Sequence, residues 1–283
     1  MRFLTFQAND TGPRPGVLVD DNTVADISGA GPKDILEVIG GGAEALDRVQ
    51  RWLSTAPTVP LRSVKLRAPI PRPPKLICVG LNYRDHAEES KMEIPKVPTI
   101  FNKFPSVVIG PGDNIVLPKN STQPDYEAEF AFVIGKAGRH VTREQWREYV
   151  FGYTNLNDVS ARDFQMATTQ WLMGKTFDTF APMGPYLVTA DEVPDPAVLD
   201  ISMTINGEVL QRSNTKNLIF PVPELIAYLS SVVTLEPGDV ISTGTPAGVG
   251  FARKPPRFLR QGDECVVEVK GLGQLRNPVV AES

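Results

Sequence analysis

The sequence predicts an α+β protein that is rich in β-structure and has a small N-terminal α+β domain. Short apolar runs, several of them bounded by Asn-Gly, Pro-Gly-Asp or Gln-Gly-Asp turns, predict strands through most of the chain. Few segments show the 3.6-residue periodicity of a helix, and prolines gather between residues 57 and 74. Because the strands and helices do not alternate regularly, the pattern does not favour a doubly wound α/β sheet.

Residues 1–70 form the predicted N-terminal domain, and residues 71–283 the main domain. In the N-terminal domain, two paired strands are predicted around an Asp-Thr-Gly-Pro turn, and two helices are predicted on either side of three consecutive glycines. We expect these elements, in order, at residues 2–7, 16–19, 32–39 and 43–53. Proline is excluded from helix interiors and central strands, so residues 57–74 are predicted to be a linker or an extended connection. We place the domain boundary near Ile70.

The main domain is predicted to be mostly β-structure. We expect strands at residues 76–79, 129–134, 153–156, 201–205, 240–243 and 265–269. Helices are expected at residues 143–149 and 223–229. The second of these has Pro223 near its first turn and an apolar face of Leu225, Ile226 and Leu229.

Composition and charge are typical of an intracellular enzyme. The chain of 283 residues has 29 basic and 33 acidic residues, a net charge of −4. This mild acidity does not favour binding to nucleic acid or to a membrane surface. Neither a signal peptide after Met1 nor an apolar run of roughly 20 residues is found, so we expect a cytoplasmic protein. Cys78 and Cys265 lie in apolar runs and are predicted to be buried, reduced thiols.

Three acids in two clusters predict a divalent-metal site. In the segment from Asp125 to Ile134 polar and apolar residues alternate, so we read it as a strand with Glu127 and Glu129 on one face. Asp158, which follows the strand predicted at 153–156, is the candidate for a third ligand. Carboxylate oxygens suit Mg²⁺, with Mn²⁺ and Ca²⁺ as alternatives. On spacing alone, a solvated strand face that carries three acids is an equal alternative.

Five further motifs follow the same order as in a known family. They lie at residues 80–89 (GLNYRDHAEE), 158–165 (DVSARDFQ), 174–178 (GKTFD), 184–185 (GP) and 242–250 (STGTPAGVG). In these motifs the chain resembles the fumarylacetoacetate hydrolase superfamily, and in particular its shorter, bacterial-type acylpyruvase-like members. The resemblance covers about residues 74–278. It implies a β-rich mixed roll with peripheral helices, and it implies that Glu127, Glu129 and Asp158 hold the metal.

His86 and Glu89 are three residues apart, which places both on one face of a helix. A carboxylate on one imidazole nitrogen makes the other nitrogen a general base for water. From the residues alone, a surface pair is the more common arrangement. The resemblance implies a catalytic His-Glu dyad here, on a segment that orders over the bound substrate. The other histidine, His140, follows a glycine-punctuated loop and is expected to be exposed without a role.

Lys175 lies in an apolar neighbourhood, where a lysine can also extend to the surface. No Gly-x-x-x-x-Gly precedes it, so a phosphate-binding loop is excluded. The resemblance implies that its ammonium stabilises a developing oxyanion. It also implies substrate contacts from Gln165 and Thr245, although the glycine-rich loop around Thr245 is equally typical of a plain turn. Asn82, Arg84 and Lys103 are weaker candidates for the same pocket.

These residues predict an enzyme that acts on a small keto acid. The first expectation is metal-dependent hydrolysis of a C–C bond in an acylpyruvate or a 2,4-diketo sugar acid, with water activated by His86. An oxaloacetate-type decarboxylase or a keto-enol or double-bond isomerase is the alternative, and a non-catalytic metal-stabilised binding module ranks third. The resemblance also implies a homodimer, for which Trp171 and residues 220–222 offer apolar surface.

Overall fold

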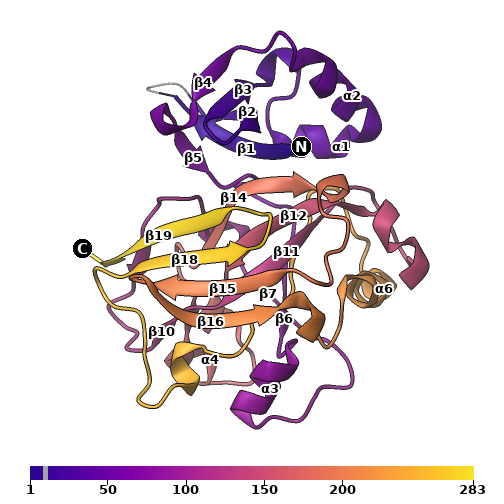
Figure 1. Ribbon diagram of the computed structural model, residues 1–283. Helices are drawn as coiled ribbons and strands as arrows, with labels where there is room; N and C mark the ends of the chain where they lie inside the picture. The colour runs from indigo at the N-terminus through magenta and orange to yellow at the C-terminus, as the bar shows by residue number, and fades with distance from the viewer. Residues whose placement is uncertain (9–11) are drawn as a thin grey trace.

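The computed structural model describes residues 1–8 and 12–283. It shows a small N-terminal unit stacked on a larger β-rich body (Figure 1). The predicted β-rich α+β class is confirmed. Asp10 and Thr11 of the predicted Asp-Thr-Gly-Pro turn lie outside the described residues.

Among residues 1–8 and 12–70, the N-terminal unit contains five strands and two α-helices. They are β1 (Arg2–Gln7), β2 (Arg14–Asp20), β3 (Thr23–Asp26), β4 (Thr58–Pro60), β5 (Lys65–Arg67), α1 (Ile35–Gly40) and α2 (Gly42–Trp52). Helix α1 begins three residues later than predicted because the Asp34 carboxylate accepts a hydrogen bond from the amide of Glu37 and caps the helix there. Both β4 and β5 lie in the proline-rich segment, which is therefore extended, as one of the two predicted alternatives states.

The body is built from two sheets that face each other. Within residues 1–8 and 12–283, the larger sheet has the strand order β4-β3-β2-β1-β14-β12-β11-β17-β6-β7, with β5 and β8 at its side, so it continues from the N-terminal unit into the body. Its remaining strands are β6 (Leu76–Gly80), β7 (Thr99–Asn102), β8 (Val108–Ile109), β11 (Ala128–Ile134), β12 (Val150–Asn157), β14 (Ala181–Thr189) and β17 (Val240–Ser242).

The second sheet has the order β16-β15-β18-β19-β9 and lies in front of the first in Figure 1. Its strands are β9 (Ile115–Leu117), β15 (Asp200–Ile205), β16 (Glu208–Asn214), β18 (Glu264–Val269) and β19 (Gln274–Ala281). The short strands β10 (Pro124–Asp125) and β13 (Ser160–Ala161) pair beside them.

Strand β11 separates two cores, as its alternating sequence requires. Phe130 and Phe132 face the core between the sheets, where Phe130 stacks on Tyr153 with ring centroids 5.3 Å apart. Ala131 and Val133 point the other way, into the core that also holds α1 and α2. The alternation predicted here therefore sets which side chains are buried together.

Helices are few and short, as predicted. They are α3 (Arg84–Ser90), α4 (Arg162–Gln165), α5 (Leu172–Lys175) and α6 (Val222–Val232). The helix predicted at 143–149 is instead a 3₁₀-helix (Arg143–Glu148), in which the amide of Tyr149 donates to the carbonyl of Trp146 three residues earlier.

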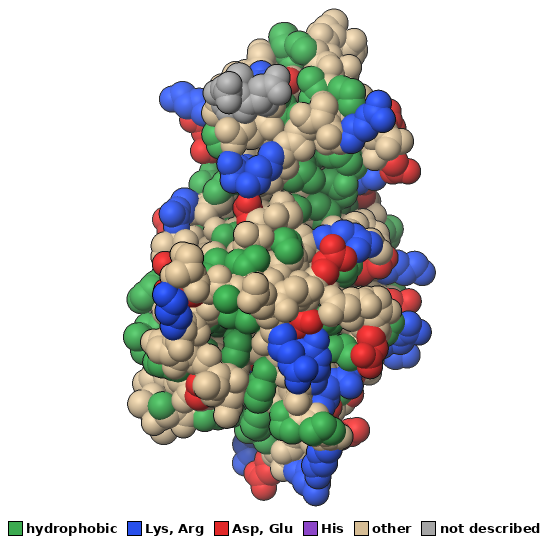
Figure 2. All heavy atoms as spheres, turned by 90° about the vertical axis from the view of Figure 1, so that its left-hand side faces the viewer, with side chains coloured by type: hydrophobic (Ala, Val, Ile, Leu, Met, Phe, Trp, Pro, Cys, Tyr) green, Lys and Arg blue, Asp and Glu red, His purple; other side chains and the backbone are tan. Residues whose placement is uncertain are grey.

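Two features of the surface and core bear on the predictions. Cys78 and Cys265 are buried free thiols, as predicted. Phe220 and Val222 are also buried, so the prediction that residues 220–222 offer apolar surface is wrong: these side chains pack into the core between the sheets. On the face shown in Figure 2, basic and acidic side chains are interspersed. In the described part of the chain, every helix is too short or too polar to cross a bilayer.

Candidate metal centre and its cavity

The three predicted acids come together at the ends of two paired strands. Strand β11 pairs with β12 so that Ala128 lies opposite Asn157, which brings Glu127 and Glu129 beside Asp158. The amide of Asp158 donates to the carbonyl of Glu127 at 3.0 Å. All three side chains are buried, and one oxygen of each lies within 4.8 Å of the others. The solvated strand face considered from spacing alone is therefore excluded.

The strand that carries the acids is interrupted, which the sequence does not indicate. The predicted strand from Asp125 to Ile134 breaks at Tyr126 and Glu127, between β10 and β11. Asp125 accepts hydrogen bonds from the amides of Gly250 and Phe251 at 2.8 and 2.9 Å, and so turns away from the main sheet. The side-chain oxygen of Asn157 accepts a hydrogen bond from the amide of Glu127 at 3.1 Å. This bond replaces the strand-to-strand hydrogen bond that the amide of Glu127 lacks at the break.

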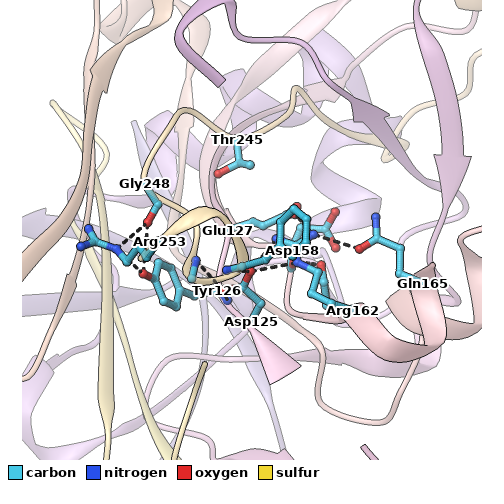
Figure 3. A network of polar contacts seen from close by, with 12 residues as sticks. Asp125, Tyr126, Glu127, Asp158, Arg162, Gln165, Thr245, Gly248 and Arg253 are labelled. Atoms are coloured by element: carbon cyan, nitrogen blue, oxygen red, sulfur yellow. Dashed lines mark hydrogen bonds and ion pairs between the residues drawn. The ribbon is translucent and has the colours of Figure 1, made fainter. Parts of the chain in front are cut away.

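Three buried cations surround the acids. Lys175, at the end of α5, donates to Glu127 Oε2 and to Asp158 Oδ2, both at 2.8 Å. Lys103 donates to Asp158 Oδ1 at 2.5 Å and to the carbonyl of Val159. Arg162 forms ion pairs with Glu127 Oε1 at 2.6 Å and with Asp125 at 2.9 Å, and Figure 3 shows its position between the acids and Gln165.

Glu129 differs from the other acids because it has no cationic partner in an ion pair within the described residues. Its carboxylate accepts hydrogen bonds from the hydroxyl of Ser242 and from the amide of Gly244. Burial, together with the carboxylates of Asp158 and Glu127, raises the pKa of Glu129 well above its usual range. Glu127 is also buried, but the ammonium of Lys175 and the guanidinium of Arg162 outweigh burial and lower its pKa to about 2.

The charges and donors of this site fit a divalent cation. With all four ionised, the carboxylates of Asp125, Glu127, Glu129 and Asp158 exceed the three cations by one negative charge, and Glu129 is the acid that has no ion pair among the described residues. Oxygen ligands on three carboxylates are the donor set that hard divalent cations prefer. With such an ion the cluster would carry a net charge of +1, which suits an anionic substrate.

A cavity of about 180 Å³ opens onto the acids. Of the predicted residues, it is lined by His86, Glu127, Glu129, Gln165, Lys175 and Thr245. His86 is on α3, and its Nδ1 lies 3.4 Å from Glu89 Oε2. Glu89 also accepts a hydrogen bond from the amide of Gly248 at 3.0 Å, so the predicted pair is attached to the glycine-rich loop that contains Thr245.

The other predicted contacts have different positions. The side-chain oxygen of Gln165 accepts a hydrogen bond from the guanidinium of Arg162 at 2.9 Å. The Thr245 hydroxyl donates to the carbonyl of Ala128, also at 2.9 Å. Asn82 is buried and holds the backbone of Phe220, while Arg84 is exposed; neither lines the cavity. Lys103 does not line it either, and instead supports Asp158 from behind.

Several residues of the site are missed by the sequence analysis. Arg162 is the most important, since it contacts both Glu127 and Gln165 and lines the cavity. A signal was present: Arg162 lies inside the quoted 158–165 motif, and buried acids require cations nearby. Ser242, which donates to Glu129, likewise lies in the quoted 242–250 motif. Trp171 and Phe101, which form part of the cavity wall, had no such signal.

A buried group of carboxylates and cations beneath a small cavity, at the ends of strands β11 and β12, has the residue types and the enclosure that are typical of an enzyme's metal site. The chain belongs to the fumarylacetoacetate hydrolase family: residues 75–280 match the family described as fumarylacetoacetate (FAA) hydrolase, C-terminal. The mitochondrial oxaloacetate tautomerase Fahd2a of Rattus norvegicus is 47% identical over 99% of this chain and 92% of that protein.

Solved structures agree with this membership over the whole chain. The fumarylacetoacetate hydrolase of Exiguobacterium antarcticum is 39% identical with a TM-score of 0.88, and covers all of both chains. The maleylpyruvate hydrolase of Sphingobium sp. SYK-6, solved with manganese(II) and pyruvate, is 33% identical with a TM-score of 0.85, again over all of both chains. The relatives are enzymes that process keto acids, and this chain is an enzyme of the same family.

Proposed function

We propose that the protein is a divalent-metal-dependent tautomerase that interconverts the enol and keto forms of an oxaloacetate-type 2-oxo acid. The observation that carries the proposal is the shared cavity, which is lined by His86, by the acids Glu127 and Glu129, and by Lys175. The tautomerase relative at 47% identity supports this reaction over the hydrolysis that we expected first from the sequence.

The chemistry requires one proton to move between oxygen and carbon. In the enol-to-keto direction the enol O–H bond breaks, the oxygen forms the C2=O bond, and the C2=C3 electron pair takes up a proton to make a C3–H bond. His86 carries that proton on the ring nitrogen that does not face Glu89. Glu89 fixes the tautomer and orientation of the ring, and hydrogen bonds from His86 and Gly248 outweigh burial to lower the pKa of Glu89.

Lys175 stabilises the negative charge that develops on the substrate oxygen. It is suited to this role because it is always charged: although burial opposes the charge, Asp158 and Glu127 raise its pKa above the ordinary value. Glu127, Glu129 and Asp158 hold the cation, which we expect to be Mg²⁺ or Mn²⁺. When bound, this ion supplies a Lewis acid for the 2-oxo oxygen.

The proposal is tested with enolic oxaloacetate, whose loss is followed by its ultraviolet absorbance. We expect the protein with Mg²⁺ or Mn²⁺ to accelerate the decay, and the protein with chelator to match buffer alone. A decay that equals the buffer rate under all metal conditions would contradict the proposal.

Hydrolysis of a C–C bond in an acylpyruvate is the second candidate. The same His86–Glu89 pair can activate a water molecule, and the maleylpyruvate hydrolase at 33% identity has this fold. Release of pyruvate from an acylpyruvate, measured beside the tautomerase assay, separates the two reactions. A cytoplasmic location also stays a prediction, since the mammalian relative is described as mitochondrial.

A further inference from the structure

The His86–Glu89 pair is held in place by the backbone of the glycine-rich loop around Thr245. The amide of Gly248 donates to both carboxylate oxygens of Glu89, at 3.1 and 3.0 Å. One of these oxygens, Oε2, also faces His86 Nδ1 at 3.4 Å. The position of the Glu89 carboxylate at the imidazole therefore depends on where the amide of Gly248 points.

The backbone of Gly248 is closely confined. Its φ is +101°, a conformation that glycine adopts without strain, and a Cβ atom here would lie 2.2 Å from the carbonyl oxygen of Leu210. The carbonyl of Gly248 accepts a hydrogen bond from the hydroxyl of Tyr126 at 3.1 Å. The loop thus packs directly on strand β16, to which Leu210 belongs, while its amide binds Glu89.

Arg253 holds this arrangement together. Its Nε donates to the Gly248 carbonyl and to the Tyr126 hydroxyl, both at 3.2 Å, as Figure 3 shows. Its Nη2 donates to the carbonyl of Leu210 at 2.5 Å. A guanidinium presents its donors in a rigid plane, which suits it to bind two carbonyls and a hydroxyl at once. One side chain therefore ties the Gly248 loop to strand β16.

The contacts connect Arg253 to the imidazole through Gly248 and Glu89. Arg253 does not line the cavity, so it reaches the reaction only through other residues. Its charge acts in the same direction as its contacts. Burial opposes the charge of Glu89, but hydrogen bonds from His86 and Gly248 outweigh burial and lower the pKa of Glu89, and the positive charge of Arg253 adds to this lowering.

We infer that Arg253 is a positioning residue for the proton transfer. It fixes Gly248 so that the carboxylate of Glu89 stays at Nδ1 of His86. This keeps the proton of the neutral imidazole on Nδ1 and leaves Nε2 free to exchange a proton with the substrate. The inference rests on the proposed tautomerase function and adds a residue to its machinery.

Replacing Arg253 with methionine should lower kcat for enolic oxaloacetate by about tenfold or more, because a displaced acid–base group loses rate steeply. KM and Mn²⁺ affinity should stay those of the wild type, since the guanidinium contacts neither the cavity nor the three acids. Lys254→Met removes the neighbouring exposed cation and should leave kcat unchanged. A loss of Mn²⁺ affinity as large as the loss of kcat would mean that Arg253 supports the whole site, and would overturn the inference.

A double-mutant cycle with Glu89→Ala tests the route. If Arg253 acts through Glu89, adding Arg253→Met to Glu89→Ala should cause no further loss of kcat. If the two losses multiply, Arg253 acts independently of the pair and the inference is wrong.

The tautomer of His86 gives a readout that does not depend on turnover. The chain has only two histidines, so the ring-nitrogen NMR signals of the neutral imidazoles can be assigned with His140→Gln. The wild-type His86 should carry its proton on Nδ1. Both Arg253→Met and Glu89→Ala should shift that proton toward Nε2. Should Arg253→Met not fold, Tyr126→Phe removes the other side-chain donor to the Gly248 carbonyl and is judged by the same shift.

The two readouts separate the positioning role from the proposed function. If the tautomer shifts as expected but the wild type does not accelerate decay of the enol, the tautomerase function is overturned and the positioning role stands. If the wild type is active and His86 keeps its Nδ1 proton in the folded variant, the positioning role is overturned and the tautomerase function stands.

Discussion

Lys175 donates a hydrogen bond from Nζ to Asp158 Oδ2 over 2.8 Å, and both side chains are buried. The same ammonium reaches Glu127, so one lysine bridges two of the three candidate metal ligands. Glu129, in contrast, accepts hydrogen bonds from the neutral donors Ser242 and Gly244 and has no ion pair among the described residues. Two of the three acids therefore have cationic partners and the third has none among the described residues, and this asymmetry leads to the predictions that follow.

Replacing Glu129 with alanine should abolish metal binding and metal-dependent turnover while the protein stays folded. The variant loses a ligand, but it also loses a buried carboxyl without a cationic partner, so folding is not impaired. Calorimetric titration with Mn²⁺ and circular dichroism measure the two properties. Glu148→Ala removes an exposed acid and is the control. Full activity in Glu129→Ala, or in protein stripped by chelator, would refute the assignment.

The metal-free protein should lose stability as pH rises above about 4.5. The pKa of Glu129 in the folded state is raised above the ordinary value of 4.5, so its contribution to stability is fully present below that value and is lost as pH rises through the folded pKa. Glu127 acts in the opposite sense: with a folded pKa of about 2, its contribution is present above 4.5 and is lost as pH falls toward 2.

The melting temperature of the metal-free protein, measured across this pH range, checks the direction of both effects. In the matched variant Glu129→Gln, the loss of stability above pH 4.5 should be smaller. Metal binding should also release a proton from Glu129 and strengthen as pH rises. Metal affinity that does not change with pH would contradict the raised pKa.

Replacing His86 with alanine should suppress acylpyruvate hydrolysis by about 10²–10⁴-fold, the usual effect of a lost general base. Metal affinity should hardly change, because His86 is not among the three clustered acids. Decarboxylation of oxaloacetate needs no attacking water and should survive better than hydrolysis. Enol-to-keto conversion, in contrast, should fall with hydrolysis, since His86 carries the proton. Unchanged rates in all three assays would remove His86 from the mechanism.

The homodimer remains a prediction, and light scattering at micromolar concentration tests it. The apolar surface suggested for it is reduced to Trp171, because Phe220 and Val222 are buried, and Trp171 itself lines the cavity. A monomer at this concentration would contradict the prediction.

Patterns that repeat along one segment could be predicted from the sequence. The alternation between Asp125 and Ile134 correctly predicts that Glu127 and Glu129 lie on the same side, because successive side chains of an extended chain point to opposite faces. The break at Tyr126 could not be predicted, because the amides that hold Asp125 belong to residues 250 and 251, which are 125 and 126 positions away in sequence.

The candidate site shows the same limit. The three acids could be located because Glu127 directly precedes one recognisable strand, Glu129 lies in it, and Asp158 directly follows the next. Lys103 was expected in the substrate pocket but lies behind Asp158, since only the folded structure decides which side of a carboxylate a lysine approaches. The role of Arg162 as a partner of both Asp125 and Glu127 likewise depends on the pairing of β10 with β13.

The position of Mn²⁺ in crystals of this protein, located by its anomalous scattering, tests the central claim most directly. The account predicts one peak between the carboxylates of Glu127, Glu129 and Asp158, with the Lys175 ammonium no longer bridging Glu127 and Asp158. A peak elsewhere, or no peak with Lys175 still 2.8 Å from both acids, would contradict the account.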